Sequence, residues 1–136
     1  MQLIKGSALR FLLMIIKEAF DILNSEKLAR LIAGFTLEKK AEQTIIMDMR
    51  AVTTITDYFV ICSADSEAQV KAITDHISDQ LKKQQINIWH TEGYESLNWV
   101  LLDLVDVVVH IFRPEIRSFY NLEGLWGDAE ISTVEA

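Results

Sequence analysis

Two apolar runs, residues 58–62 and 107–109, constrain the fold of this sequence more than any other feature. Each run is apolar at odd and even positions alike. Successive side chains of a β-strand point to opposite faces of a sheet, so strands of this kind are covered on both sides. Helical patterns alternate with the strand-like runs, and this mixture predicts a layered α/β domain. We expect one small mixed β-sheet of about five strands, flanked by helices.

Five segments are typical of strands: residues 44–47, 58–62, 86–90, 99–103 and 106–112. The last two are joined by Leu104-Val105. A two-residue hairpin turn requires positive φ, which a β-branched valine resists. We therefore expect this turn to be wider or its register to be shifted.

Capping patterns and apolar spacing predict the helices. Asn24 or Ser25 can cap a helix whose apolar stripe is Leu28, Leu31, Ile32 and Phe35. Ser66 and Gln69 form a capping-box pattern that opens a helix to about residue 84, with a buried stripe of Val70, Ile73, Ile77 and Leu81. Pro114 fits the first turn of a short helix through residue 120.

The charge of the chain is concentrated at one end. Residues 92–136 hold nine acidic residues against two arginines, whereas residues 1–91 hold eleven of each sign, so the net charge of −7 lies in the last third. Such a field attracts a basic partner and repels bare nucleic acid. The length of 136 residues predicts a single domain. The one cysteine, Cys62, lies in an apolar run, which favours a buried structural thiol and a cytoplasmic setting.

The N-terminal segment differs from the rest. Its apolar run, residues 11–16, is too short for a membrane span or a signal-peptide core. Leu12, Ile16, Phe20 and Leu23 recur at helical spacing and predict an amphipathic helix. Packing on the domain, self-association into a homodimer, and a start codon at Met14 all stay open. We divide the chain into an N-terminal extension (1–24), a domain (25–130) and a C-terminal tail (131–136).

Residues 103–126 contain the motifs Asp-x-x-Asp-Val-Val-Val-His-Ile-Phe and Pro-Glu-x-Arg-x-Phe-Tyr-x-Leu-Glu-x-Leu-Trp. Further matches are Lys40-Ala41-Glu42, Thr56-Asp57-Tyr58-Phe59-Val60-Ile61, Ser66 with Gln69-Val70, and Glu92-Gly93. Together these motifs resemble the ribosomal silencing factor family (RsfS, Iojap-related) over about residues 25–129. The resemblance implies a non-catalytic, nucleotidyltransferase-like fold. It also implies binding to the large ribosomal subunit through ribosomal protein fourteen, which hinders joining of the small subunit. Val105 stands where the family usually has glycine.

One face of the expected hairpin is the candidate partner-binding site. Asp103 and Asp106 flank the turn, and because like charges side by side destabilise a strand pair, a lysine or arginine from a partner is favoured over two solvated aspartates or a metal site. Trp99, Leu101 and Asp103 share one face of a regular strand. An aromatic beside a carboxylate suits a polar-rimmed interface better than a core. The resemblance implies that the tryptophan and both aspartates contact the ribosomal protein.

Arg117 and Tyr120 are the further candidates, because arginine and tyrosine are common binding anchors. Phe119 and Trp126 are explained at least as well by pinning the C-terminal segment to the sheet. The three histidines show no metal-ligand spacing. His110, inside an apolar strand, is interpreted as a hydrogen-bonded core residue rather than a catalyst.

The main enzymatic alternative is a nucleotidyltransferase. Ala64-Asp65-Ser66 stands where Gly-Ser would cradle phosphate, and no third carboxylate joins the aspartate pair. We expect a non-enzymatic cytoplasmic factor without cofactors, metals, membrane contact or direct specific binding of nucleic acid. Its expected function is to dock on the large ribosomal subunit and repress translation by blocking subunit joining. A role in large-subunit assembly uses the same contact and stays open.

Overall fold

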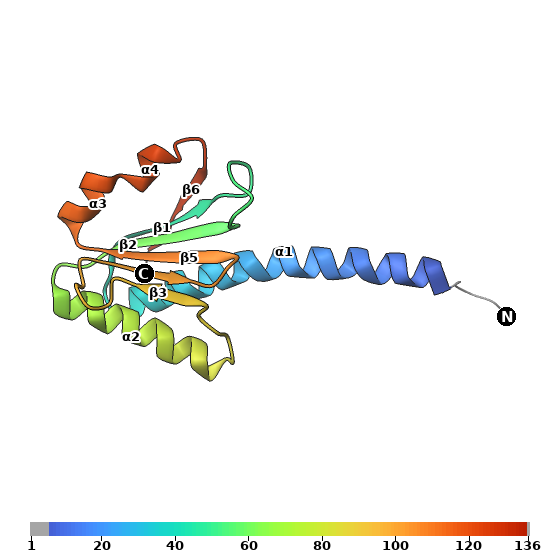
Figure 1. The fold of residues 1–136 in the computed structure, drawn as a ribbon, viewed down its shortest axis with the longest axis horizontal. Coiled ribbons are helices and arrows are strands. Elements are labelled where there is room, and N and C mark those ends of the chain that lie inside the picture. The colour runs from blue at the N-terminus through green and yellow to red at the C-terminus, as the bar shows by residue number, and fades with distance from the viewer. Residues whose placement is uncertain (1–5, 136) are drawn as a thin grey trace.

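The computed structural model describes residues 6–135, and for residues 18–24 it describes the backbone alone. One mixed sheet of six strands, in the order β3-β4-β5-β2-β1-β6, organises the chain (Figure 1). The strands are β1 (Glu42–Asp48), β2 (Tyr58–Ser63), β3 (His90–Glu92), β4 (Trp99–Asp103), β5 (Val107–Phe112) and β6 (Glu130–Thr133). The layered α/β class is confirmed, with one strand more than the five expected.

The pairing of the strands follows from their connections. β2 and β5 are parallel, and every other neighbouring pair is antiparallel. Parallel neighbours need a long crossover, and here the crossover contains α2 (Glu67–Lys83), β3 and β4. The expected hairpin of residues 99–103 and 106–112 is confirmed as β4 and β5.

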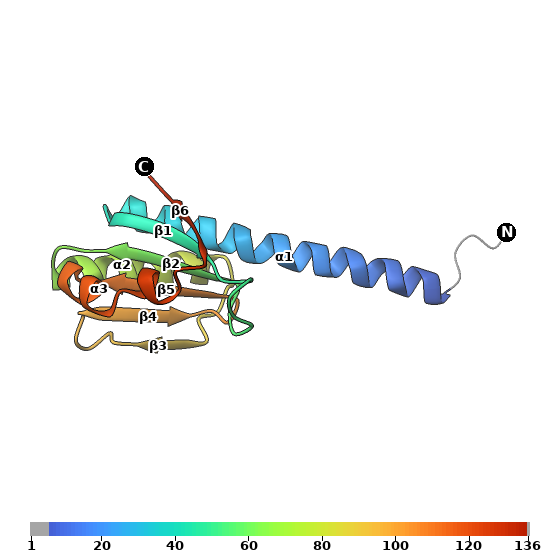
Figure 2. The ribbon, with the colours of Figure 1, turned by 90° about the horizontal axis from the view of Figure 1, so that it is seen from above.

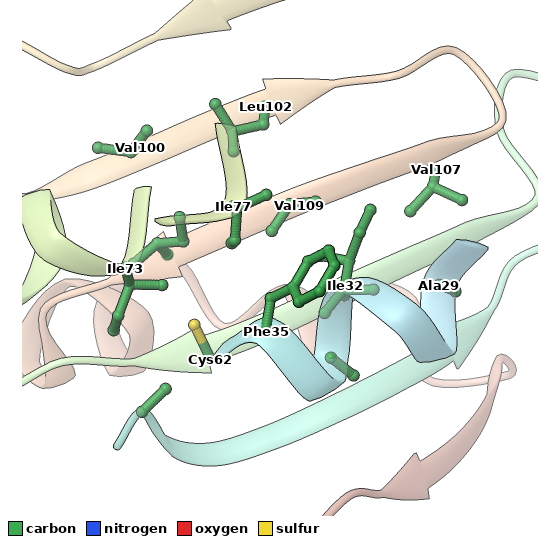
Figure 3. Packing of buried hydrophobic residues seen from close by; sticks show 14 of the residues in the cluster. Ala29, Ile32, Phe35, Cys62, Ile73, Ile77, Val100, Leu102, Val107 and Val109 are labelled. Atoms are coloured by element: carbon green, nitrogen blue, oxygen red, sulfur yellow. The ribbon is translucent and has the colours of Figure 1, made fainter. Parts of the chain in front are cut away.

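Helices cover the two faces of the sheet unequally. The C-terminal part of α1 (Gly6–Glu38) and α2 lie on one face, while the short helices α3 (Pro114–Tyr120) and α4 (Leu122–Leu125) lie on the other (Figure 1). The first face carries the main core, where Ile32 and Phe35 of α1 and Ile73 and Ile77 of α2 pack on Val109 and its neighbours (Figure 3). The other face has a smaller cluster around Met47, Ile61 and Phe112.

Local hydrogen bonding explains why α2 matches its prediction. Ser66 accepts the backbone N–H of Gln69, and the Gln69 side chain accepts the N–H of Asp65. The amide of Gln69 also donates to the carbonyls of Lys39 and Lys40, which ties α2 to the end of α1. The predicted stripe of Val70, Ile73, Ile77 and Leu81 is fully buried.

The prediction of a helix cap at Asn24 or Ser25 is wrong, because α1 runs without a break from Gly6 to Glu38. Intrahelical bonding overrides the cap preference of these two residues, which are tolerated inside helices. The expected division at residue 24 therefore falls inside a helix. Residues 1–5 of the expected extension, and the side chains of Phe20 and Leu23, lie outside the described part of the chain. None of the helices within residues 6–135 is long and apolar enough to cross a membrane.

Two other segments differ from expectation. Residues 86–89, predicted as part of a strand, precede β3, and Ile86 and Ile88 pack against the core without joining the sheet. Their alternation therefore reflects loop packing rather than strand pairing. Residues 131–133, expected in the C-terminal tail, belong to β6, which pairs with β1.

Candidate protein-docking face

The face of the sheet that carries α3 and α4 is left partly open over β4 and β5. Trp99, Leu101 and Asp103 of β4 are half-buried and alternate with buried Val100 and Leu102, so the predicted sharing of one face is confirmed. On the same face, β5 places Val108 beside Asp103, His110 beside Leu101, and Phe112 beside Trp99.

Two adjoining hollows lie on this open face. The first, of about 210 Å³, is lined by Thr53, Ile55, Thr56, Phe59, Leu101, Asp103, Val108, His110 and Trp126. The second, of about 300 Å³, is lined by Ile55, Trp89, Asp103, Val105 and Val108. Ile55, Asp103 and Val108 line both hollows, so the carboxylate of Asp103 borders each of them. We call the residues of the two hollows the docking face.

The docking face exposes large apolar side chains at its rim. Ile55 is 83% exposed, Trp89 73% and Val105 56%. They come from three different segments: the β1–β2 loop, the segment before β3, and the β4–β5 turn. Contiguous apolar surface of this kind marks interaction sites in soluble proteins. The sequence analysis missed Ile55, inside a mostly polar loop, and Trp89, inside an assumed strand.

The turn that ends the docking face is tight, and its two residues are Val105 and Asp106 rather than Leu104 and Val105. Of the two expected alternatives, the shifted register is confirmed and the wider turn is wrong. Asp103 pairs with Val108 rather than with Asp106, so the two aspartates do not face each other across the strand pair.

The N–H of Leu104 donates to the carbonyl of Val107, and the N–H of Asp106 donates to the carbonyl of Leu104. Val105 between them takes a φ of 73°, a strained γ-turn conformation. The Asp103 carboxylate accepts the N–H of Val105 at 2.8 Å, which stabilises the turn.

Replacing Val105 by glycine should therefore raise the free energy of unfolding by about 1 kcal/mol. A non-glycine residue in the left-handed region costs about 1–2 kcal/mol, and the larger backbone entropy of glycine in the unfolded chain offsets part of the gain. Urea unfolding measures the difference. Val108→Gly, on the same face but inside β5, should be destabilising. A loss of stability in Val105→Gly would contradict the assigned strain.

An aromatic cluster borders the docking face. The Trp99 indole N–H donates to Nδ1 of His110 at 3.1 Å. The Trp99 ring stacks on Phe112 and contacts Tyr120, with centroid distances of 4.8 and 4.9 Å. Trp99 thus packs against the smaller cluster and is also partly exposed to solvent. Its role in binding a partner stays a prediction.

His110 is a buried, hydrogen-bonded histidine, as predicted. Its Nδ1 must be the acceptor, because an indole nitrogen can only donate, so a neutral ring carries its proton on Nε2. Burial lowers the pKa of His110 to about 3. Nε2 has no hydrogen-bond partner within residues 6–135, and the ring of Phe59 lies edge-to-face at 4.7 Å.

Burial of neutral His110 predicts a dependence of stability on pH. Between about pH 6.5 and pH 3 the unfolded chain binds a proton at this residue and the folded chain does not. Stability should therefore fall as the pH falls through this window, by about 1.4 kcal/mol per pH unit. Urea unfolding from pH 7 to pH 4.5 should show a shallower decline for His110→Gln than for wild type. Parallel curves would contradict the neutral buried state.

Arg117 is buried, so the expectation that it contributes to the surface is wrong. Its Nη1 donates to the carbonyl of Gln43 and to Oγ of Ser63, at 2.8 and 2.9 Å. Its Nε donates to the Glu123 carboxylate at 3.3 Å. The guanidinium therefore anchors α3 and α4 to β1 and β2. Apolar spacing could not reveal this role, because the partners are polar and far away in sequence.

The other aromatic candidates divide differently from expectation. Tyr120 is exposed beside Trp99, as predicted for a surface residue. Phe119 is 79% exposed, so the interpretation that it pins the C-terminal segment is wrong. Trp126 is half-buried against the smaller cluster and makes a T-shaped contact with Phe59, which agrees with pinning. Cys62 is buried, and burial raises the pKa of its thiol to about 12, as expected of a structural cysteine.

Asp106 ends the turn at the edge of the docking face. Its backbone carbonyl accepts the N–H groups of Asp57 and Tyr58, which joins the turn to the start of β2. Its side chain is exposed, whereas that of Asp103 is half-buried. In the described part of the chain, no three histidine, cysteine, aspartate or glutamate side chains are grouped as metal ligands.

The chain is thus a small α/β domain whose sheet carries an open, largely apolar face with one half-buried carboxylate. The family described as ribosomal silencing factor during starvation, RsfS, matches residues 22–136, and the chain belongs to this family. The resemblance seen in the sequence is thereby confirmed.

Individual relatives agree with this assignment. The chain is 42% identical over 113 residues to ribosomal silencing factor RsfS of Halalkalibacterium halodurans, covering 83% of this chain and 97% of that protein. It is 28% identical over 92 residues to mouse mitochondrial assembly of ribosomal large subunit protein 1, covering 65% of this chain and 40% of that protein. A crystal structure of a Chromobacterium violaceum protein superposes with a TM-score of 0.73 at 32% identity, covering 82% of this chain and 92% of that one.

Proposed function

We propose that this protein represses translation by binding the large ribosomal subunit through its docking face and sterically blocking the small subunit. The contact is a basic ribosomal protein, large-subunit protein fourteen. Repression needs no chemistry, because a domain of 15.5 kDa at the subunit interface occupies space that the other subunit needs.

The docking face is the observation that carries the proposal. Interfaces combine large apolar anchors with a polar rim. Ile55, Trp89 and Val105 provide exposed apolar anchors around the two hollows, and Asp103 provides the carboxylate shared by both. A complementary partner would present an apolar side chain to the hollows and a neighbouring lysine or arginine to Asp103.

Charge favours a protein contact over an RNA contact. Residues 92–136, which include β4 and β5, hold nine acidic residues against two arginines. Binding to nucleic acid depends on cationic side chains that neutralise phosphates. The net negative charge of this segment attracts a basic ribosomal protein and speeds its association.

The arrangement of the aspartates supports a role without catalysis. Asp103 ends β4 and holds the turn through its bond to the N–H of Val105, while Asp106 follows at the end of the turn. Two-metal chemistry instead needs several carboxylates converging on ions about 4 Å apart. Asp103 and Asp106 therefore act as charges toward a partner.

A role in assembly of the large subunit is the second candidate. The mouse relative is named for assembly of the mitochondrial ribosomal large subunit. The same docking face would serve such a role, because an assembling subunit and a mature one can present the same protein.

Sedimentation with purified ribosomal subunits tests the proposed function. The protein should travel with the large subunit on a sucrose gradient, and should reduce formation of joined ribosomes when small subunits are added. Binding to the large subunit without any effect on joining would replace silencing by the assembly role. Sedimentation with the small subunit alone would overturn both.

A further inference from the structure

The first half of α1 projects from the domain as an unsupported apolar helix (Figures 1 and 2). We call residues 6–17 the arm. Its large apolar side chains are all between 43% and 61% exposed: Leu9, Phe11, Leu12, Leu13, Met14, Ile15 and Ile16. Isolated helices are marginal in water, and an apolar patch of this kind marks an interaction site.

We propose that the arm pairs with the arm of a second copy of this chain, in antiparallel orientation. Leu9, Leu13 and Ile16 are spaced by four and three residues, and the sequence continues this spacing at Phe20 and Leu23. Alternating steps of four and three place apolar residues along one seam, as in a two-helix coiled coil. The seam therefore fits another helix of the same pattern.

The charges of α1 select a second copy in antiparallel orientation as the occupant. Residues 6–17 carry Arg10 and Lys17 and no acidic residue, whereas residues 18–25 carry Glu18 and Asp21 and no basic residue. Antiparallel pairing sets the basic half of one helix along the acidic half of the other. Parallel pairing would set like charges side by side. The segment is thus complementary to itself, and a two-fold pair satisfies both halves at once.

The domain leaves room for this pairing. Residues 6–25 span roughly 30 Å at 1.5 Å per residue, so the two domains lie at opposite ends of the paired helices. α1 packs on the face of the sheet opposite to the one that carries α3, α4 and the docking face (Figure 1). At the root of the arm, Lys27, Leu28, Leu31 and Ile86 line a hollow of about 380 Å³, where the N-terminal end of the second arm arrives.

Sedimentation equilibrium of the full chain tests the proposal. Wild type should have twice the 15.5 kDa mass of one chain at micromolar concentration. Leu13→Glu with Ile16→Glu, on the seam, should be a monomer over the same range. The matched control, Phe11→Glu with Met14→Glu, places the same charges beside the seam and should remain a dimer. All four side chains are exposed, so the domain should stay folded in both variants, which circular dichroism checks.

Charge reversal tests whether the two helices pair through complementary charges, and disulfide trapping tests their orientation. Arg10→Glu with Lys17→Glu should be a monomer alone, as should Glu18→Lys with Asp21→Lys, and a mixture of the two should restore a dimer. Disulfide trapping should join Ala8→Cys to Asn24→Cys, and not Ala8→Cys to itself. A monomeric wild type, a monomeric off-seam control, or a disulfide between two Ala8→Cys chains would overturn the proposal.

Discussion

Replacing Arg117 by leucine should lower the free energy of unfolding by roughly 3–5 kcal/mol, because breaking a buried ion pair leaves polar groups without partners. The substitution removes the donors to the Gln43 carbonyl and to Ser63, and leaves the Glu123 carboxylate without its cation. Urea unfolding monitored by circular dichroism measures the loss.

Arg50 provides the matched control for this prediction. Its guanidinium donates two hydrogen bonds to Asp48, at 2.9 and 2.7 Å, but its side chain is 43% exposed. Exposed ion pairs contribute about 0–1 kcal/mol, so Arg50→Leu should be nearly neutral. Equal losses in the two variants would show that Arg117 does not anchor α3 and α4.

Reversing the charge of both aspartates should weaken binding to the large subunit by about 100-fold at low salt. Opposing like charges across an interface cost several kcal/mol, and about 3 kcal/mol corresponds to this factor. Added salt should weaken the wild-type complex and strengthen that of Asp103→Lys with Asp106→Lys, because screening reduces repulsion as well as attraction. Filter binding at two salt concentrations measures both.

Neutral substitutions separate charge from turn structure. Asp103→Asn with Asp106→Asn keeps a side-chain oxygen for the N–H of Val105 and removes both charges. Its affinity should lie between those of wild type and the lysine variant. If the lysine variant binds more tightly than wild type, the face meets phosphates rather than a basic protein.

Local interactions decide which elements could be predicted from the sequence. α2 is set by the cap at Ser66 and by a stripe of four buried residues, all of them close in sequence. β4 and β5 were predictable because their buried positions, apart from His110, are apolar. β6 is exposed along its whole length, so it has no buried apolar pattern that could be recognised in the sequence. It becomes a strand only because the folded chain brings it beside β1.

The docking face was predicted only in part, for a similar reason. The alternation of Trp99, Leu101 and Asp103 follows from strand geometry alone. Ile55 and Trp89 reach the same place from other loops, so only the folded chain brings them together. Val105 shows the limit of turn preferences, because the bond from its N–H to Asp103 helps to hold a conformation that valine ordinarily avoids.

Photo-cross-linking from the docking face is the most direct test of the central claim. A photoreactive benzoylphenylalanine in place of Trp89, which is 73% exposed, should cross-link to a basic protein of purified large subunits. The same group in place of Asp79, exposed on α2 over the opposite face, should not cross-link. Cross-links from position 79 in the absence of any from position 89, or cross-links from position 89 to ribosomal RNA alone, would contradict docking through this face.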